Sequence, residues 1–223
     1  MPTEPLTKPM SPASLSLKLA APSPSDRVLV IVPGRSGGNI AAELLPQFTQ
    51  AVVLDSSAER LKASSSPRCI RGQATRLPFL RHSFDVILSF EALYCIRPPW
   101  TVLAEFHRVL APEGKLALLE PARHGLFSAL RDKIAGPGKR VFDLDEVRSR
   151  LRRADYDMQK VEAAQPLAGM PFPAWCVLAK KKEFAAEPAP TFHTAKELIE
   201  KRKQRSAGTS MPASEAEAEI PEA

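Results

Sequence analysis

The stretch that decides the fold is LPFLRHSFDVILSFEALYCIRPPWTVLAEFHRVLAPEGKLALLEP, residues 77–121. Within it, Phe84–Ser89 and Leu116–Glu120 are short and mainly apolar, which is typical of strands buried on both faces of a parallel sheet. Between them, Thr101–Leu110 places apolar residues at helical spacing, and a Pro-Glu-Gly turn follows. The stretch therefore predicts a strand, a helix and a second strand of an α/β sheet.

The same alternation continues towards the N-terminus. Val28–Val32 and Ala51–Leu54 are continuous apolar runs, and Cys69–Arg71 is a shorter candidate strand. Helical patterns over Asn39–Phe48 and from Ser57 to Leu61 separate these segments. Three further strands are therefore expected before the deciding stretch.

Towards the C-terminus, Leu126–Ile134 is predicted to be helical. Asp143, with Glu146 three residues later, predicts the capping box of a further helix. Met158–Ala163 and Trp175–Lys180 are predicted strands with a short connection, which indicates a hairpin and hence an antiparallel last pair.

The 223 residues are 44% hydrophobic and 25% charged, which suits one core of roughly 150 residues with flexible ends. We expect a disordered Pro/Ser-rich tail over residues 1–25, a domain over 26–184 and a flexible tail over 185–223. Residues 194–206 are compatible with a short capped helix in that last tail. Residues 15–19 alternate apolar and polar side chains, so a short edge strand is the alternative there.

Composition also limits the class of protein. The sequence has no run of about 18 apolar residues and no secretory signal pattern, so no membrane span is expected. Three scattered cysteines, Cys69, Cys95 and Cys176, argue against a disulfide framework or a zinc site. We therefore expect a cytoplasmic protein without a metal ion.

Charge gives a weaker indication of partners. The formal net charge is +6, and residues 123–153 hold nine Lys or Arg against four acids. Few aromatic residues interleave with these charges for base stacking, so a solvated helix face is favoured over a nucleic-acid surface. We expect no nucleic-acid partner.

Two features upstream indicate chemistry. A strand leads into Pro33–Gly38, whose glycines and following helix place backbone N–H groups at the carboxyl edge of a sheet, where nucleotides bind. Asp55 ends the next strand, about 20 residues later, where a carboxylate can accept hydrogen bonds from both hydroxyls of a ribose. The alternative role for Asp55 is a helix cap.

From Arg27 to about Lys182 the sequence resembles the class I S-adenosylmethionine-dependent methyltransferases, of the small-molecule type that includes ubiquinone-biosynthesis enzymes. The resemblance rests on Gly72-Gln73-Ala74, Leu77-Pro78-Phe79, Phe84-Asp85-Val86 and Arg108-Val109-Leu110-Ala111-Pro112-Glu113-Gly114. It implies a Rossmann-like, seven-stranded, mostly parallel sheet with helices on both faces and the last strand antiparallel. It also implies S-adenosylmethionine as cofactor and a small molecule as methyl acceptor.

The resemblance also assigns roles to single residues. For the cofactor, Asp55 would hold the ribose, and the other binding residues would be Gly34, Ser36, Gly38, Gln73, Ala74, Ser89 and Phe90. Glu91 and Tyr94, which follow the fourth strand, would contact the substrate. If the acceptor is a hydroxyl, His124 in the loop after the fifth strand is the candidate general base, and a solvated loop histidine is its alternative role.

Three departures from the family pattern bear on activity. Val28–Val32 lacks the acid that the family uses for the amino group of the cofactor, and such a charge-assisted hydrogen bond is worth about ten- to 150-fold in affinity. Gln73 replaces the usual Asp, although an amide can serve adenine as donor and acceptor. Only a Pro-rich tail precedes the first strand, which leaves the cleft either open or closed by a protein partner.

Two other functions are considered. Tyr156 and Lys160 have the spacing of a short-chain dehydrogenase pair, but Tyr156 falls at the start of a strand rather than on a helix, so we treat the match as accidental. The serious alternative is a non-catalytic methyltransferase-like binding or scaffold protein, which the degenerate first motif favours.

Overall fold

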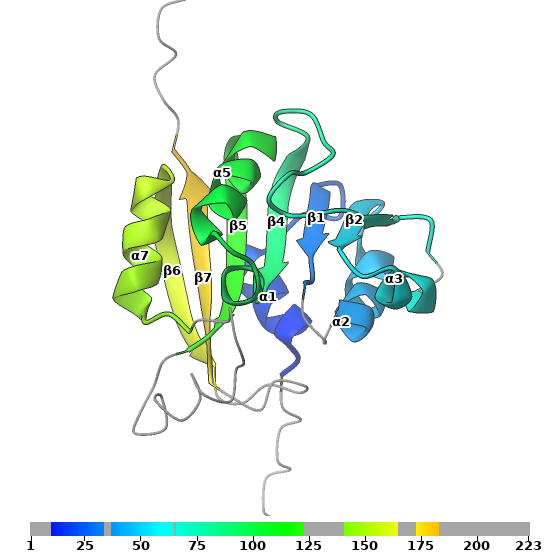
Figure 1. Ribbon diagram of the computed structural model, residues 1–223, viewed down its shortest axis with the longest axis horizontal. Helices are drawn as coiled ribbons and strands as arrows, with labels where there is room; N and C mark the ends of the chain where they lie inside the picture. The colour runs from blue at the N-terminus through cyan, green and yellow to red at the C-terminus, as the bar shows by residue number, and fades with distance from the viewer. Residues whose placement is uncertain (1–9, 34–36, 65, 123–140, 165–172, 183–223) are drawn as a thin grey trace, which may run out of the picture. The chain divides into compact units, whose positions relative to one another are not determined.

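The computed structural model describes residues 10–33, 37–64, 66–122, 141–164 and 173–182 (Figure 1). The strands are β1 Arg27–Ile31, β2 Gln50–Asp55, β3 Cys69–Arg71, β4 Phe84–Phe90, β5 Leu110–Pro121, β6 Tyr156–Ala164 and β7 Ala174–Lys181. The helices are α1 Pro12–Ala20, α2 Gly37–Leu44, α3 Ala58–Ser64, α4 Ala92–Cys95, α5 Pro99–Val109 and α7 Leu144–Arg153, with a 3-10 turn η1 over Leu45–Gln47.

The seven strands form one sheet in the order β3-β2-β1-β4-β5-β7-β6. Strands β3, β2, β1, β4 and β5 pair in parallel, whereas β7 is antiparallel to both β5 and β6. The predicted fold is therefore confirmed, including the antiparallel last strand. The helices after Leu126 and over residues 194–206 were predicted for segments outside the described residues.

Each face of the sheet carries its own apolar core. In β1, Val28 and Val30 belong to the core beneath α1 and α2, whereas Leu29 and Ile31 belong to the core beneath α5 and α7. In Figure 1, α5 and α7 cover the near face and α1 lies behind the sheet. Because both faces are covered, the central strands are mainly apolar on both faces, as the sequence pattern indicated.

The capping box of α7 is present as predicted. The side chain of Asp143 accepts a hydrogen bond from the backbone N–H of Glu146 at 2.7 Å, and the backbone N–H of Asp143 donates to the Glu146 carboxylate at 3.3 Å. Two N–H groups that a helix leaves without partners are thereby satisfied. These contacts explain why α7 begins at Leu144.

The prediction that residues 1–25 are disordered is wrong for Pro12–Ala20, and the edge-strand alternative is also wrong, because this segment is α1. Ser11 caps the helix by accepting from the backbone N–H of Ser14 at 3.0 Å, and it donates to the Glu43 carboxylate of α2 at 2.6 Å. Leu15 and Leu19 are buried against the sheet. Pro12 and the serines, read as signs of disorder, thus serve as helix start and cap.

The position of α1 also corrects the expectation that no helix precedes the first strand. The helix packs against β5 and β7 on the far face.

Replacing Leu19 tests whether α1 is part of the folded domain. Leu19 is 5% exposed, so Leu19→Ala should lower the free energy of unfolding by about 2–4 kcal/mol. Urea denaturation measures the change, and Lys18→Ala, at an exposed position of the same helix, should change it by less than about 0.5 kcal/mol. Equal, negligible effects of both substitutions would contradict the docking of α1.

Candidate functional site

Parallel strands bring several polar side chains to one edge of the sheet. Asp55 ends β2, Ser89 and Phe90 end β4, and Glu120 lies at the end of β5. Strand β1 lies between β2 and β4, and β5 follows β4. These strand ends therefore surround the end of β1, which is where open α/β sheets bind ligands.

The carboxylate of Asp55 is only 2% exposed, and donors from its own chain surround it. Its Oδ1 accepts from the backbone N–H of Ser57 at 2.9 Å and from Nη2 of Arg60 at 2.6 Å, and its Oδ2 accepts from Nε of Arg60 at 2.6 Å. The bidentate ion pair neutralises the buried charge. Asp55 thus also orders the turn that leads into α3, which was the alternative role considered for it.

Arg60 connects this acid to the start of the glycine loop. Its Nη2 also donates to the backbone carbonyl of Pro33 at 3.2 Å, just beyond β1. The hydrogen bonds to Asp55 raise the pKa of Arg60, and the nearby Cys95 of α4 acts in the same direction. Sequence reasoning missed Arg60, although its signal was local: an arginine five residues after a strand-end acid.

The β3 end of this edge holds the residues assigned to adenine. The backbone N–H of Gly72 donates to the carbonyl of Asp55 at 3.0 Å, which keeps the following turn beside β2. A Cβ on Gly72 would lie 2.9 Å from Cδ1 of Leu54, so glycine permits this close approach. Gln73 is exposed and Ala74 is buried, so the amide of Gln73 is accessible while Ala74 contributes apolar surface.

The corner after β4 turns sharply into α4. Ser89 is fully buried, and its hydroxyl has no hydrogen-bond partner among the described residues. Glu91 has a left-handed backbone (φ 58°), and its N–H donates to the carbonyl of Leu119 at 2.8 Å. The turn therefore places Glu91 and Tyr94, the predicted substrate contacts, beside the end of β5.

Glu120 holds this corner in place and was also missed by sequence reasoning. Its two carboxylate oxygens accept from the backbone N–H groups of Leu93 and Tyr94, each at 3.0 Å. Burial raises the pKa of Glu120 to about 8, and this effect outweighs the opposing effect of the backbone donors. Glu120 therefore positions the first turn of α4, and its protonation state is coupled to that contact.

The most specific part of the family pattern has a structural role. The Glu105 carboxylate of α5 accepts from the backbone N–H of Leu77 at 2.7 Å, and Arg108 donates to the carbonyls of Phe79 and Leu77 at 2.8 and 3.0 Å. Glu105 and Arg108 also pair with each other at 2.8 Å. These hydrogen bonds hold the Leu77-Pro78-Phe79 turn against α5.

Only some of the other residues singled out in the sequence belong to the described part of the chain. Gly34, Ser36 and His124 fall outside the described residues, and Gly38 lies in the first turn of α2. Tyr156 is buried and its hydroxyl donates to the carbonyl of Leu103 at 3.5 Å, whereas Lys160 pairs with Glu162 at 3.1 Å. The structure therefore gives no support to a Tyr-Lys catalytic pair.

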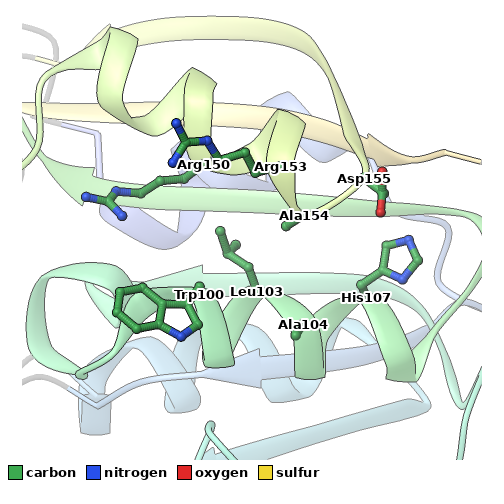
Figure 2. A pocket seen from close by; sticks show the side chains of 8 residues that line it. All are labelled: Trp100, Leu103, Ala104, His107, Arg150, Arg153, Ala154 and Asp155. Atoms are coloured by element: carbon green, nitrogen blue, oxygen red, sulfur yellow. The ribbon is translucent and has the colours of Figure 1, made fainter. Parts of the chain in front are cut away.

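A cavity of about 510 Å³ lies between α5 and α7 (Figure 2). Trp100 and His107 line it from α5, and Arg150 and Arg153 line it from α7. Asp55, Ser89 and Glu120 do not contribute to its lining, so it is separate from the carboxyl edge.

Membrane-spanning helices and metal-binding clusters are both absent from the described part of the chain. No helix there is long and apolar enough to cross a membrane. No group of three His, Cys, Asp or Glu side chains there has an arrangement that would hold a metal ion.

Glu120 predicts a specific dependence of stability on pH. The folded protein keeps the Glu120 proton up to a pKa of about 8, whereas the unfolded chain loses it near 4.5. The free energy of unfolding should therefore fall by several kcal/mol as the pH rises from 4.5 to about 8. The slope in this range should be about 1.4 kcal/mol per pH unit. Urea denaturation at several pH values measures the slope.

Glu120→Gln should remove this slope because the amide does not titrate, and its overall stability should be lower at acidic pH because the amide NH2 cannot accept from the second backbone N–H. Asp145→Asn, at an exposed position of α7, should retain the wild-type slope. A Glu120→Gln variant with an unchanged slope would show that another group causes the pH dependence.

Known methyltransferases share sequence similarity with this chain. The profile of the methyltransferase domain family matches residues 32–118. The 27-O-demethylrifamycin SV methyltransferase of Amycolatopsis mediterranei is 33% identical over 123 residues, which is 52% of this chain and 44% of that protein. The demethylmenaquinone methyltransferase of Renibacterium salmoninarum is 35% identical over 101 residues, 44% of this chain and 42% of that protein.

The chain spans less than half the length of either of these relatives. Among solved structures, the protein bound to the Trm112 methyltransferase activator of Haloferax volcanii matches with a TM-score of 0.65 and 18% identity, over 77% of this chain and 89% of that one. Such a likeness shows the fold alone. The domain match covers less than half of this chain, and together with the curated relatives and the sheet topology it supports a class I S-adenosylmethionine-dependent methyltransferase.

Proposed function

We propose that this chain binds S-adenosylmethionine at the carboxyl edge of its sheet and transfers the methyl group to a small-molecule acceptor in the cytoplasm. The observation that carries the proposal is the buried carboxylate of Asp55, which lies at the end of β2 and is joined through Arg60 to Pro33 at the start of the glycine loop. The match of residues 32–118 to the methyltransferase domain family supports the choice of S-adenosylmethionine as ligand.

The residues fit the adenosyl part of the ligand. We propose that Asp55 accepts from ribose hydroxyls, that Gln73 provides an amide donor and acceptor for adenine, and that Ala74 provides apolar contact. Gly38 begins α2 together with Gly37, and with Gly34 and Ser36 it is proposed to face the methionine part, where helix N–H groups favour a carboxylate.

The acceptor side is proposed to lie at the corner after β4. Ser89 and Phe90 end β4, and Glu91 and Tyr94 follow in a turn that Glu120 holds. When bound, S-adenosylmethionine supplies an activated methyl group, so these residues need only orient the acceptor and exclude water. For a hydroxyl acceptor, His124 is the proposed general base that accepts its proton.

The names of the curated relatives suggest which methyl acceptors to test first in an activity assay. By their names, the two curated relatives act on 27-O-demethylrifamycin SV and on demethylmenaquinone. The Haloferax volcanii neighbour was solved with an activator protein, and a protein partner that closes the cleft is part of the proposal.

A second function is a non-catalytic methyltransferase-like binding module. Two observations favour it. Strand β1 ends at the apolar Ile31 and is followed by the apolar Val32, without the acid that the family pattern has there, and Arg60 already pairs with the carboxylate of Asp55. Such a module would bind partners without transferring a methyl group.

Calorimetric titration with S-adenosylmethionine separates the two functions. Wild type should bind, and Asp55→Asn should bind at least about tenfold more weakly, because a charged acceptor for the ribose hydroxyls is lost. Glu59→Gln, at an exposed acid of α3, should bind like wild type. Folded wild-type protein that gives no heat at millimolar ligand would contradict the enzyme and favour the binding module.

A further inference from the structure

The hydrogen-bonding capacity of Asp55 is nearly used up within the protein. A carboxylate has about four acceptor positions. Ser57 N–H and the Arg60 fork already occupy three of them, at 2.6 to 2.9 Å. One position cannot accept both hydroxyls of a ribose.

Arg60 is also the group that covers Asp55. The Asp55 side chain is 2% exposed, whereas the Arg60 side chain is 30% exposed. Arg60 lies in α3, three residues after Ser57, so its long side chain can turn into solvent without moving the sheet. The Ser57 N–H comes from the backbone and stays in place.

Arg60 also bridges the two strand ends between which a nucleoside would lie. Its Nη2 donates both to Asp55 Oδ1 and to the carbonyl of Pro33, at 2.6 and 3.2 Å. Rotation of this one side chain would release two acceptor positions on Asp55 and open the space between the ends of β1 and β2.

We propose that Arg60 is an internal competitor for the ribose hydroxyls and thereby sets the affinity of this site for adenosyl ligands. The proposal rests on the proposed function, because it assumes that Asp55 holds a ribose. Ligand binding exchanges the Arg60 fork for two hydroxyl donors, and Arg60 moves to solvent. The affinity of wild type is reduced by the stability of the ion pair that must be broken.

Arg60→Met should therefore bind adenosyl ligands more tightly than wild type. The expected gain is about tenfold, since a charge-assisted bidentate pair is lost in wild type on binding but not in the variant. The ligand-free variant should also have a lower melting temperature, because the buried Asp55 charge then keeps only the Ser57 donor.

The experiment is calorimetric titration with S-adenosylhomocysteine, whose thioether carries no charge, so that removal of a positive charge does not by itself favour the ligand. Arg60→Lys keeps the charge without the fork and should give a smaller gain. Arg71→Met removes a positive charge beside Asp55 in the strand register and should bind like wild type. The gain should vanish in Arg60→Met/Asp55→Asn and for the 2′,3′-dideoxy analogue of the ligand.

The outcomes separate this proposal from the proposed function. If wild type binds in an Asp55-dependent way and Arg60→Met binds equally or more weakly, the competitor role is overturned and the cofactor site stands. If Arg60→Met binds S-adenosylhomocysteine and wild type does not, the result supports both the competitor role of Arg60 and the proposed cofactor site. Absence of binding by every folded variant at millimolar ligand overturns both.

Discussion

The buried carboxylate of Asp55 is the interaction on which the carboxyl edge of this sheet depends. A carboxylate that is 2% exposed needs strong donors, and the structure supplies them from Ser57 and Arg60. These contacts fix the start of α3, the end of β2 and, through Pro33, the end of β1. The same acid is the group that the family pattern assigns to a ribose, so structural and binding roles compete at one side chain.

A second buried acid organises the other side of this edge. Glu120 binds the first N–H groups of α4 and so determines where the corner after β4 places Glu91 and Tyr94. Asp55 forms an ion pair with the guanidinium group of Arg60, whereas burial raises the pKa of Glu120 to about 8. Two acids at the ends of β2 and β5 thus connect the same edge of the sheet to α3 and to α4 by different interactions.

Most of the sheet could be predicted because its signals are local. The apolar runs of β1, β2, β4 and β5 follow from burial on both faces, and the capping box of α7 lies within four residues. Helix α1 could not be predicted in this way, because its stability comes from distant contacts, such as Ser11 with Glu43 and Leu19 with the sheet. Glu120 was missed for the same reason, since its donors lie 26 and 27 residues away.

The central claim is that an adenosyl ligand displaces Arg60 from Asp55, and nuclear magnetic resonance of the Arg60 side chain tests it most directly. In the free protein the Nε–H of Arg60 should resonate apart from solvent-exposed arginines and exchange slowly with water. Saturating S-adenosylhomocysteine should move this resonance to the position of an exposed arginine. An Arg60 resonance that stays unchanged while the ligand binds, or shows no response at millimolar ligand, would contradict the account.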